Sequence, residues 1–261
     1  MGHRRHWPLS LFLLIEIISI LMPLFILIVW SLSGRWPWPD LAPEALSLRG
    51  IQSLLGGRFD ILQVMFSSTG FSLVVAVLAT IIGTMAARAI VFYDFRGKKL
   101  ISFGSILPII VPGTVLGMGI HVVFIYLGLS DTYLGVLLVH LICALPYTVA
   151  IMADITRAVG NKLEIQAQVL GVPVGKAFSH VTLPQLLPGI LSSLSMAYII
   201  SFSQYFLTLL IGGGSVKTLA VVMVPLIYGG DRTIASAYAL LFTLSSLIVF
   251  GLFELAGKKM K

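Results

Sequence analysis

The sequence predicts an all-α membrane protein with six transmembrane helices, a cytoplasmic helix–turn–helix insert and one short external helix. The 261 residues are 58% hydrophobic and only 10% charged, whereas an ordinary soluble domain carries roughly 25% charged residues. Apolar windows of membrane-spanning length recur along the chain. One polar, helix-forming insert interrupts them at residues 157–185. Lipid is therefore expected to be the solvent for most of the chain.

The membrane spans follow from length, because a helix needs about 20 apolar residues to cross the hydrocarbon core. Six windows qualify: Leu9–Leu32, Leu62–Ala87, Ile101–Leu127, Tyr133–Asp154, Leu186–Ile211 and Ile234–Leu255. A seventh apolar segment, Leu219–Tyr228, contains Pro225 and is too short to span, so we expect a short external helix there. We predict a single transmembrane domain over residues 1–261.

The basic residues set the orientation. An even number of spans places both termini on one side, and the positive-inside rule makes that side the cytoplasm. Twelve of the 17 lysines and arginines then lie inside and five outside. This distribution explains the net charge of +7 without a nucleic-acid partner. The first apolar run ends without a small-residue cleavage site, which favours a retained helix over a signal peptide. The sequence predicts a multi-pass protein of the plasma (inner) membrane.

The first external loop carries two local predictions. Trp36-Pro37-Trp38-Pro39 is expected to be extended, since each proline restricts the residue before it. Residues Ser47–Leu55 have the composition of a short surface helix.

The insert has the pattern of two helices joined by a turn. Asn161 is placed as an N-cap, with Glu164 in the capping-box position three residues later. Gly171 suits the left-handed turn that ends a helix. Pro173 suits the first turn of the next helix.

The second helix of the insert is expected to be amphipathic. Its apolar positions recur at helical spacing, at Val174, Ala177, Phe178 and Val181. Pro184 and Pro188 are expected to end it and turn the chain into the fifth span. The result is a knob that either docks into a groove of another protein or packs on its own bundle.

The insert also resembles the loop signature of ATP-binding-cassette (ABC) importer permeases, written E-A-A, three residues, G, nine residues, I-x-L-P. The positions in register are Ala167, Gly171, Leu183 and Pro184. Val181 occupies the isoleucine position. The glutamate position holds Ile165, with Glu164 one place early, and the first alanine position holds Gln166.

Three further segments carry the same resemblance. Leu107–Gly113 is similar to the proline-broken third helix of these permeases. Ser203–Leu207 with Gly212–Gly214 resembles the region around the fifth helix, and Leu219–Pro225 followed by Gly229–Arg232 also fits. The resemblance is nearest to the type I importers that carry polyamines, sulfate, thiamine, ferric iron or phosphonates. It implies the type I ABC importer permease fold.

The resemblance implies a division of labour among subunits. A second permease subunit, identical or different, pairs with this chain. A periplasmic or lipid-anchored binding protein delivers the solute, and two cytoplasmic ATPase subunits bind ATP and Mg. This chain is then expected to hold no cofactor, no metal and no catalytic residue. The residues implied in ATPase coupling are Glu164, Ala167, Gly171, Val174, Ala177, Phe178, Val181, Leu183 and Pro184.

The fifth window carries a polar stripe at helical spacing, which comprises Tyr198, Ser201, Gln204, Tyr205 and Thr208. Polar groups within a span face either a pathway or a hydrogen-bonding neighbour helix. The position of the fifth helix in the family favours the translocation pathway. The stripe is neutral, which disfavours polyamines and leaves anions, zwitterions and complexed species open.

Two other classes of protein are considered. An ion-coupled secondary transporter would use Glu16, His121, His140 or Asp154 as proton sites, but it predicts an inverted repeat that the sequence does not show. An intramembrane enzyme would need paired catalytic groups, and the sequence contains no HExxH, Walker A or nucleophile-elbow motif. Cys143, in an apolar run, is interpreted as a packing residue. His121 and His140 are interpreted as hydrogen-bonded structural groups.

Overall fold

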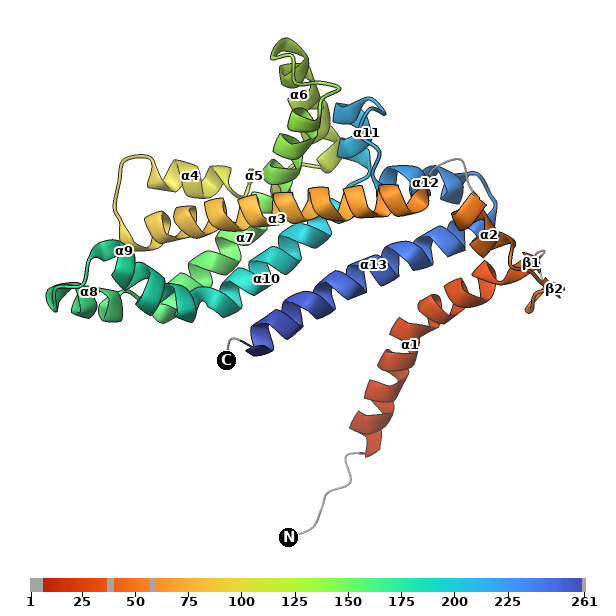
Figure 1. Cartoon of the computed structure of the whole chain (residues 1–261), viewed down its shortest axis with the longest axis horizontal. Coiled ribbons are helices and arrows are strands. Elements are labelled where there is room, and N and C mark those ends of the chain that lie inside the picture. The colour runs from red at the N-terminus through yellow and green to blue at the C-terminus, as the bar shows by residue number, and fades with distance from the viewer. Residues whose placement is uncertain (1–6, 37–39, 57–59, 260–261) are drawn as a thin grey trace, which may run out of the picture. The chain divides into compact units, whose positions relative to one another are not determined.

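The computed structural model describes residues 7–36, 40–56 and 60–259, almost all of them helical (Figure 1). The described residues form two compact units. The first contains the chain up to Leu62 together with Val222–Ser245, and the second contains Gln63–Val221 together with the chain from Ser246 onward. Helices α12 and α13 contribute to both units.

The first unit joins the end of one long helix to a short surface helix. Its elements are α1 (Trp7–Ser31), β1 (Ser33–Arg35), β2 (Ala45–Leu46), α2 (Arg49–Gly56) and parts of α12 (Leu219–Tyr228) and α13 (Arg232–Lys259). The two strands pair antiparallel. Gly50 in α2 lies so close to α1 that a Cβ there would be 2.7 Å from the Ser31 carbonyl oxygen. Thr233 Oγ1 donates a 2.9 Å hydrogen bond to the Ser33 carbonyl.

The predicted surface helix of the first external loop is observed as α2. The extended conformation predicted for residues 36–39 falls mainly on 37–39, which lie outside the described residues. Trp30 stacks on Trp36 with ring centroids 4.4 Å apart, and the Arg232 guanidinium lies 5.2 Å from the Trp30 ring centroid. This first unit is therefore held by aromatic and charged contacts as well as by helix packing.

The second unit is built around α7. Its elements are α3 (Ile61–Phe92), α4 (Lys98–Gly104), α5 (Leu107–Ile110), α6 (Gly113–Tyr126), α7 (Tyr133–Val159), α8 (Lys162–Val169), α9 (Val174–Ala177), the π-helical turn η1 (Phe178–Thr182), α10 (Leu183–Phe202) and α11 (Phe206–Gly212), with the start of α12 and the end of α13. Helix α7 packs against α10, α11 and α5.

Glycines allow α7 to approach its neighbours closely. A Cβ at Gly83 in α3 would lie 2.5 Å from Thr148 Oγ1 in α7, and one at Gly189 in α10 would lie 2.8 Å from Ile155 Cγ1 in α7. Thr148 Oγ1 also donates to the Ala79 carbonyl at 3.1 Å. Small residues at helix crossings are typical of membrane bundles, where van der Waals packing replaces the hydrophobic effect between helices.

Five helical segments of the described chain are long and apolar enough to cross a membrane. They are Ser10–Ser31, Ile61–Phe92, Tyr133–Val159, Val174–Phe202 and Arg232–Lys258. Four of them cover the first, second, fourth and sixth predicted windows. A sixth candidate is the pair Lys98–Ile110 and Gly113–Tyr126, which is bent by 114°. The short apolar helix predicted at Leu219–Tyr228 is observed as α12.

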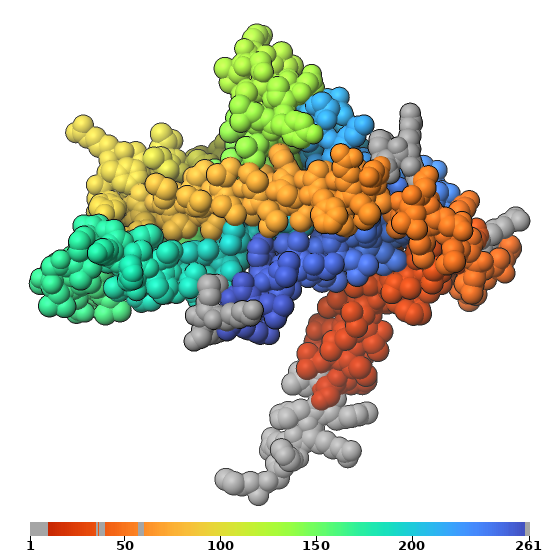
Figure 2. Space-filling model, viewed as in Figure 1, coloured from red at the N-terminus to blue at the C-terminus, as the bar shows by residue number. Residues whose placement is uncertain are grey.

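The third predicted window is not one straight helix. Val111 is extended, with ψ of 130°, and Pro112 then begins the new direction of α6. Proline lacks a backbone N–H and disfavours the helical conformation of the residue before it. Helix α6 consequently stands out from the rest of its unit, as the light green helix at the top of Figures 1 and 2 shows.

The fifth predicted window is displaced along the chain. Its helix begins at Val174, passes through η1 without stopping and ends at Phe202, and α11 begins separately at Phe206. The prediction that Pro184 and Pro188 end the preceding helix is therefore wrong. Pro184 occupies the first turn of α10, and the wide hydrogen-bonding spacing of the π turn before it leaves room for a residue without an N–H.

Candidate functional site

The loop between α7 and α10 is fixed by a buried carboxylate. Glu164 on α8 accepts hydrogen bonds at 3.0 Å from Arg88 Nη2 to both of its oxygens. Thr182 Oγ1 in η1 donates to the same carboxylate at 2.6 Å. The predicted capping box is wrong: α8 begins after Asn161, but the Asn161 side chain makes no capping bond, and the Glu164 carboxylate bonds to Arg88.

Arg88, near the end of α3, connects the loop to the helix bundle. Its side chain is 20% exposed and that of Glu164 is 7% exposed. The guanidinium lies 4.8 Å from the Phe178 ring centroid and 5.5 Å from that of Phe92. Charge-assisted hydrogen bonds in such a shielded position are stronger than those at the surface. The ion pair thus holds α3, α8 and η1 together.

The turn between α8 and α9 follows the predicted geometry. Gly171 has φ of +90°, in the left-handed region that favours glycine. The Val172 N–H donates to the Ala167 carbonyl at 3.0 Å, and Pro173 lies at the N-terminal boundary of α9. The chain therefore reverses tightly between two short helices, as predicted for a helix–turn–helix knob.

The predicted coupling residues divide between two faces of this loop. Glu164 and Ala177 are buried, and Phe178 packs on Ala87, Met152 and Leu186 of the bundle. Gly171, Val174 and Pro184 are exposed, and Ala167, Val181 and Leu183 are partly buried. The motif positions therefore include buried residues that fix the loop to the bundle and residues that lie on the surface of the loop.

The outer face of the loop carries exposed apolar side chains, which we call the docking face and define as Val169, Leu170, Val172 and Val174. Val169 is 81% and Leu170 84% exposed. The loop is the green segment at the left of Figure 2. Sequence reasoning missed Val169 and Leu170, although two adjacent apolar residues at the end of a polar helix are a usable signal. It also missed Arg88 and Thr182, for which the sequence offers none.

The predicted polar stripe divides where α10 ends. Tyr198 and Ser201 are on α10 and Thr208 is on α11, and all three are buried. Gln204 and Tyr205 lie in the break between these helices and are partly exposed. The expectation of one continuous helical stripe is wrong, because the helix stops at Phe202.

A cavity of about 440 Å³ opens beside this break. It is lined by Pro108, Gly113, Thr114, Leu116, Cys143, Tyr147, Ile200, Gln204, Phe206 and Leu207. The broken third span thus faces the broken fifth span across a space large enough for a small solute. The lining is mainly apolar, with Thr114, Tyr147 and Gln204 as polar groups.

The proposed proton sites have individual surroundings. Glu16 is exposed on α1. Asp154 pairs at the surface with Arg157 at 2.7 Å, and His140 hydrogen-bonds to hydroxyl groups. Across the residues that the structure describes, no group of three or more His, Cys, Asp and Glu is arranged to hold a metal ion.

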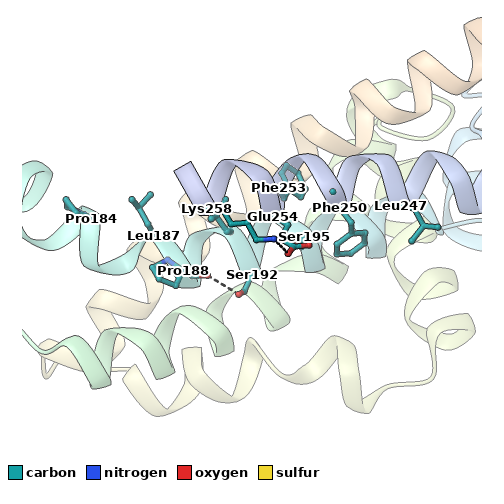
Figure 3. Close-up of a pocket in the computed structure, with 13 residues that line it drawn as sticks. Pro184, Leu187, Pro188, Ser192, Ser195, Leu247, Phe250, Phe253, Glu254 and Lys258 are labelled. Carbon is teal, nitrogen blue, oxygen red and sulfur yellow. Dashed lines mark hydrogen bonds and ion pairs between the residues drawn. The ribbon is translucent and has the colours of Figure 1, made fainter. Parts of the chain in front are cut away.

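A larger apolar groove of about 760 Å³ runs between α10 and the end of α13 (Figure 3). Phe250 and Leu247 on α13 and Leu187 and Pro188 on α10 line it. Two contacts involve its polar side chains: Lys258 pairs with Glu254 at 2.8 Å, and Ser192 donates to the Pro188 carbonyl at 2.9 Å. This groove therefore has the character of a lipid-facing or helix-packing surface.

Comparison with known proteins identifies the family. A family model described as "Binding-protein-dependent transport system inner membrane component" matches residues 79–261. The inner membrane ABC transporter permease protein YnjC of Escherichia coli is 31% identical over 152 residues, which are 58% of this chain but only 30% of YnjC. The putative 2-aminoethylphosphonate permease PhnV of Salmonella typhi is 25% identical over 247 residues, covering 94% of this chain and 92% of PhnV.

A solved structure shows the same fold. The crystal structure of a bacterial ABC transporter involved in the import of the acidic polysaccharide alginate contains a chain that matches with a TM-score of 0.71. The match covers 94% of this chain and 93% of that one at 16% identity. The family match over residues 79–261 decides against an ion-coupled carrier and an intramembrane enzyme. The chain belongs to the family of binding-protein-dependent transport system inner membrane components, which are transport permeases.

Proposed function

We propose that this chain is the permease subunit of an ATP-driven importer of a small polar solute and that the α8–η1 loop couples it to ATPase subunits. Family membership supports the first part. The observation that carries the second is the contrast between the two faces of the loop. The inner face is fixed to α3 by the Arg88–Glu164 pair, and the outer docking face exposes Val169 and Leu170.

The loop is built to transmit movement. Helix α9 continues through η1 into α10, so one helical segment extends from Val174 to Phe202. A packed helix moves as a unit when force is applied at one end. A push on the docking face therefore reaches the break at residues 203–205 and the cavity beside it.

The assembly that we propose has several parts. It contains this chain, a second permease subunit that is identical or different, two cytoplasmic ABC ATPase subunits that bind ATP and Mg, and an external solute-binding protein. This chain forms one membrane domain without a cofactor of its own. Both termini and the loop at residues 157–185 face the cytoplasm.

The proposed pathway passes the cavity between the two broken spans. Gln204 lines this cavity, Tyr205 lies in the break beside it, and the buried Tyr198, Ser201 and Thr208 support the break from within. The neutral stripe disfavours polyamines and leaves anionic, zwitterionic and complexed solutes open. Selection among such solutes belongs to the binding protein.

Co-purification tests the coupling proposal. The tagged chain is purified from its native membranes in mild detergent as wild type, as V169D/L170D and as L55D. Leu55 on α2 is 80% exposed, so it provides a matched control for adding a charge to an exposed apolar side chain. We expect an ABC ATPase, identified by mass spectrometry, with wild type and L55D and at least a tenfold loss with V169D/L170D. Equal recovery with all three proteins, at unchanged gel-filtration profiles, would refute the docking face.

A further inference from the structure

One side chain of α7 bridges the two helices that flank the break in the fifth span. His140 Nδ1 lies 2.9 Å from Ser201 Oγ near the end of α10, and His140 Nε2 lies 2.9 Å from Thr208 Oγ1 on α11. Ser201 Oγ lies 3.2 Å from Ser72 Oγ on α3. His140 is fully buried, and its ring meets Phe71 edge-on at a centroid distance of 5.2 Å. The network thus joins α3, α7, α10 and α11.

The number of protons on each group determines which group donates in the hydrogen bonds of His140. The Thr208 hydroxyl has one proton, which it donates to the Gln204 carbonyl at 2.5 Å. Thr208 must then accept from His140, so Nε2 carries a proton. Burial without a counter-charge favours a neutral imidazole, which leaves Nδ1 to accept from Ser201.

The network ends on the backbone of the residue that faces the cavity. The Gln204 carbonyl is held by Thr208, and the Gln204 N–H donates to the Ser201 carbonyl at 3.2 Å. Ser201 and Thr208, which both bond to the Gln204 backbone, also both bond to His140. The position of the Gln204 side chain in the cavity wall therefore depends on His140.

We propose that His140 is a positioning residue for translocation: it sets the geometry of the Ser203–Tyr205 break and so holds Gln204 at the cavity. The transport part of this proposal rests on the proposed function above. The positioning part does not, because it is a statement about this chain alone. The two are tested separately.

Chemical labelling measures the position of residue 204 without a transport substrate. The native sequence has one cysteine, Cys143, so C143A/Q204C carries a single thiol at the break. Its rate of modification by a maleimide is measured in the purified chain as such and with H140L, H140Q or T208V added. Net hydrogen-bond energies near 1 kcal/mol correspond to about fivefold in an equilibrium, so H140L is expected to change the rate at least about fivefold.

The remaining variants separate positioning from loss of structure. H140Q retains an acceptor for Ser201 and a donor for Thr208, so its rate is expected to lie nearer wild type than that of H140L. T208V is expected to change the labelling rate at position 204 as much as H140L does. Combining the two replacements is expected to change that rate no further. The control H121L makes the same replacement on α6 and is expected to leave the rate unchanged. The thiol of C143A/S195C, in the separate groove between α10 and α13, is expected not to respond to H140L.

The possible results distinguish the positioning role of His140 from its link to translocation. An H140L replacement that leaves the labelling rate at position 204 unchanged, or that changes the rate at position 195 equally, overturns the positioning role. A changed rate at position 204 with normal solute uptake by the assembled H140L transporter upholds the positioning and overturns its link to translocation. Failure of the chain to recover an ATPase subunit would overturn the proposed function while leaving the labelling result intact.

Discussion

Arg88 and Glu164, 76 positions apart in sequence, are joined by two hydrogen bonds of 3.0 Å from a single guanidinium nitrogen. The pair connects the end of a membrane helix to the loop that we propose as the coupling element. Two further residues of the loop contact the pair: Thr182 bonds to Glu164 and the Phe178 ring lies beside Arg88.

Removing one partner is expected to loosen the loop. Breaking a buried ion pair costs about 3–5 kcal/mol, and the partial exposure of Arg88 reduces this to about 2 kcal/mol for E164A. Trypsin should then cleave faster after Lys162 and Lys176, measured by mass spectrometry of timed digests. D154N removes an exposed ion pair with Arg157 and should leave cleavage unchanged, because such pairs contribute about 0–1 kcal/mol. Identical digestion of E164A and wild type would contradict the role of the pair.

The turn at Gly171 should depend on backbone conformation and not on space. Nothing lies within 4 Å of a Cβ placed at Gly171, but its φ is +90°. G171A is therefore expected to cost about 1–2 kcal/mol and to lower ATPase recovery in the co-purification assay. Gly175 has equally open surroundings without a positive φ, so G175A is the matched control. If both variants recover the ATPase as wild type does, the turn is not required for docking.

Helix α3 offers a paired test of close packing. G83A places a Cβ 2.5 Å from Thr148 Oγ1, whereas G70A on the same helix meets nothing within 4 Å. Overpacking typically costs about 1–3 kcal/mol, so G83A should lower the midpoint of thermal unfolding in detergent, and G70A should not. The midpoints are read from fluorescence-detected gel filtration after heating. A G83A midpoint equal to that of G70A would show that α3 and α7 approach less closely.

Gln204 should influence transport without influencing assembly. Q204L removes one of the polar groups that line the cavity, and we expect at least a severalfold change in the uptake rate with normal subunit recovery. The solute is first identified as the ligand of the cognate binding protein by mass spectrometry and calorimetry. Q52L makes the same replacement on the exposed helix α2 and is expected to transport as wild type does. Uptake kinetics of Q204L that match those of Q52L would remove Gln204 from the pathway.

The sequence predicted the helices whose signal is local. Apolar length located α1, α3, α7 and α13, and Gly171 marked the turn between α8 and α9 because few other residues adopt its conformation. The predictions failed where neighbouring segments changed the effect of a local sequence signal. Pro184 was expected to end a helix, but the π turn before it makes its missing N–H harmless. The window at 186–211 was predicted to be continuous, because apolar residues on both sides of Gln204 hide the break.

The functional contacts were harder to predict than the helices. Glu164 was singled out as a residue of the loop, but its partners Arg88 and Thr182 come from segments that only the fold brings together. The same holds for His140, whose two hydroxyl partners lie 61 and 68 positions away. A single sequence reports which residues are polar within an apolar run, and it does not report which of them meet.

The wide turn η1 has a consequence for chain length. A π turn accommodates one residue more than an α turn, so deleting one residue from 178–182 would restore ordinary α-helical spacing and rotate α9 by about 100° about the axis of α10. Val174 would then point in a different direction, while the helical segment that ends at Phe202 stayed continuous. The number of residues in this turn therefore sets the direction in which the loop projects from α10.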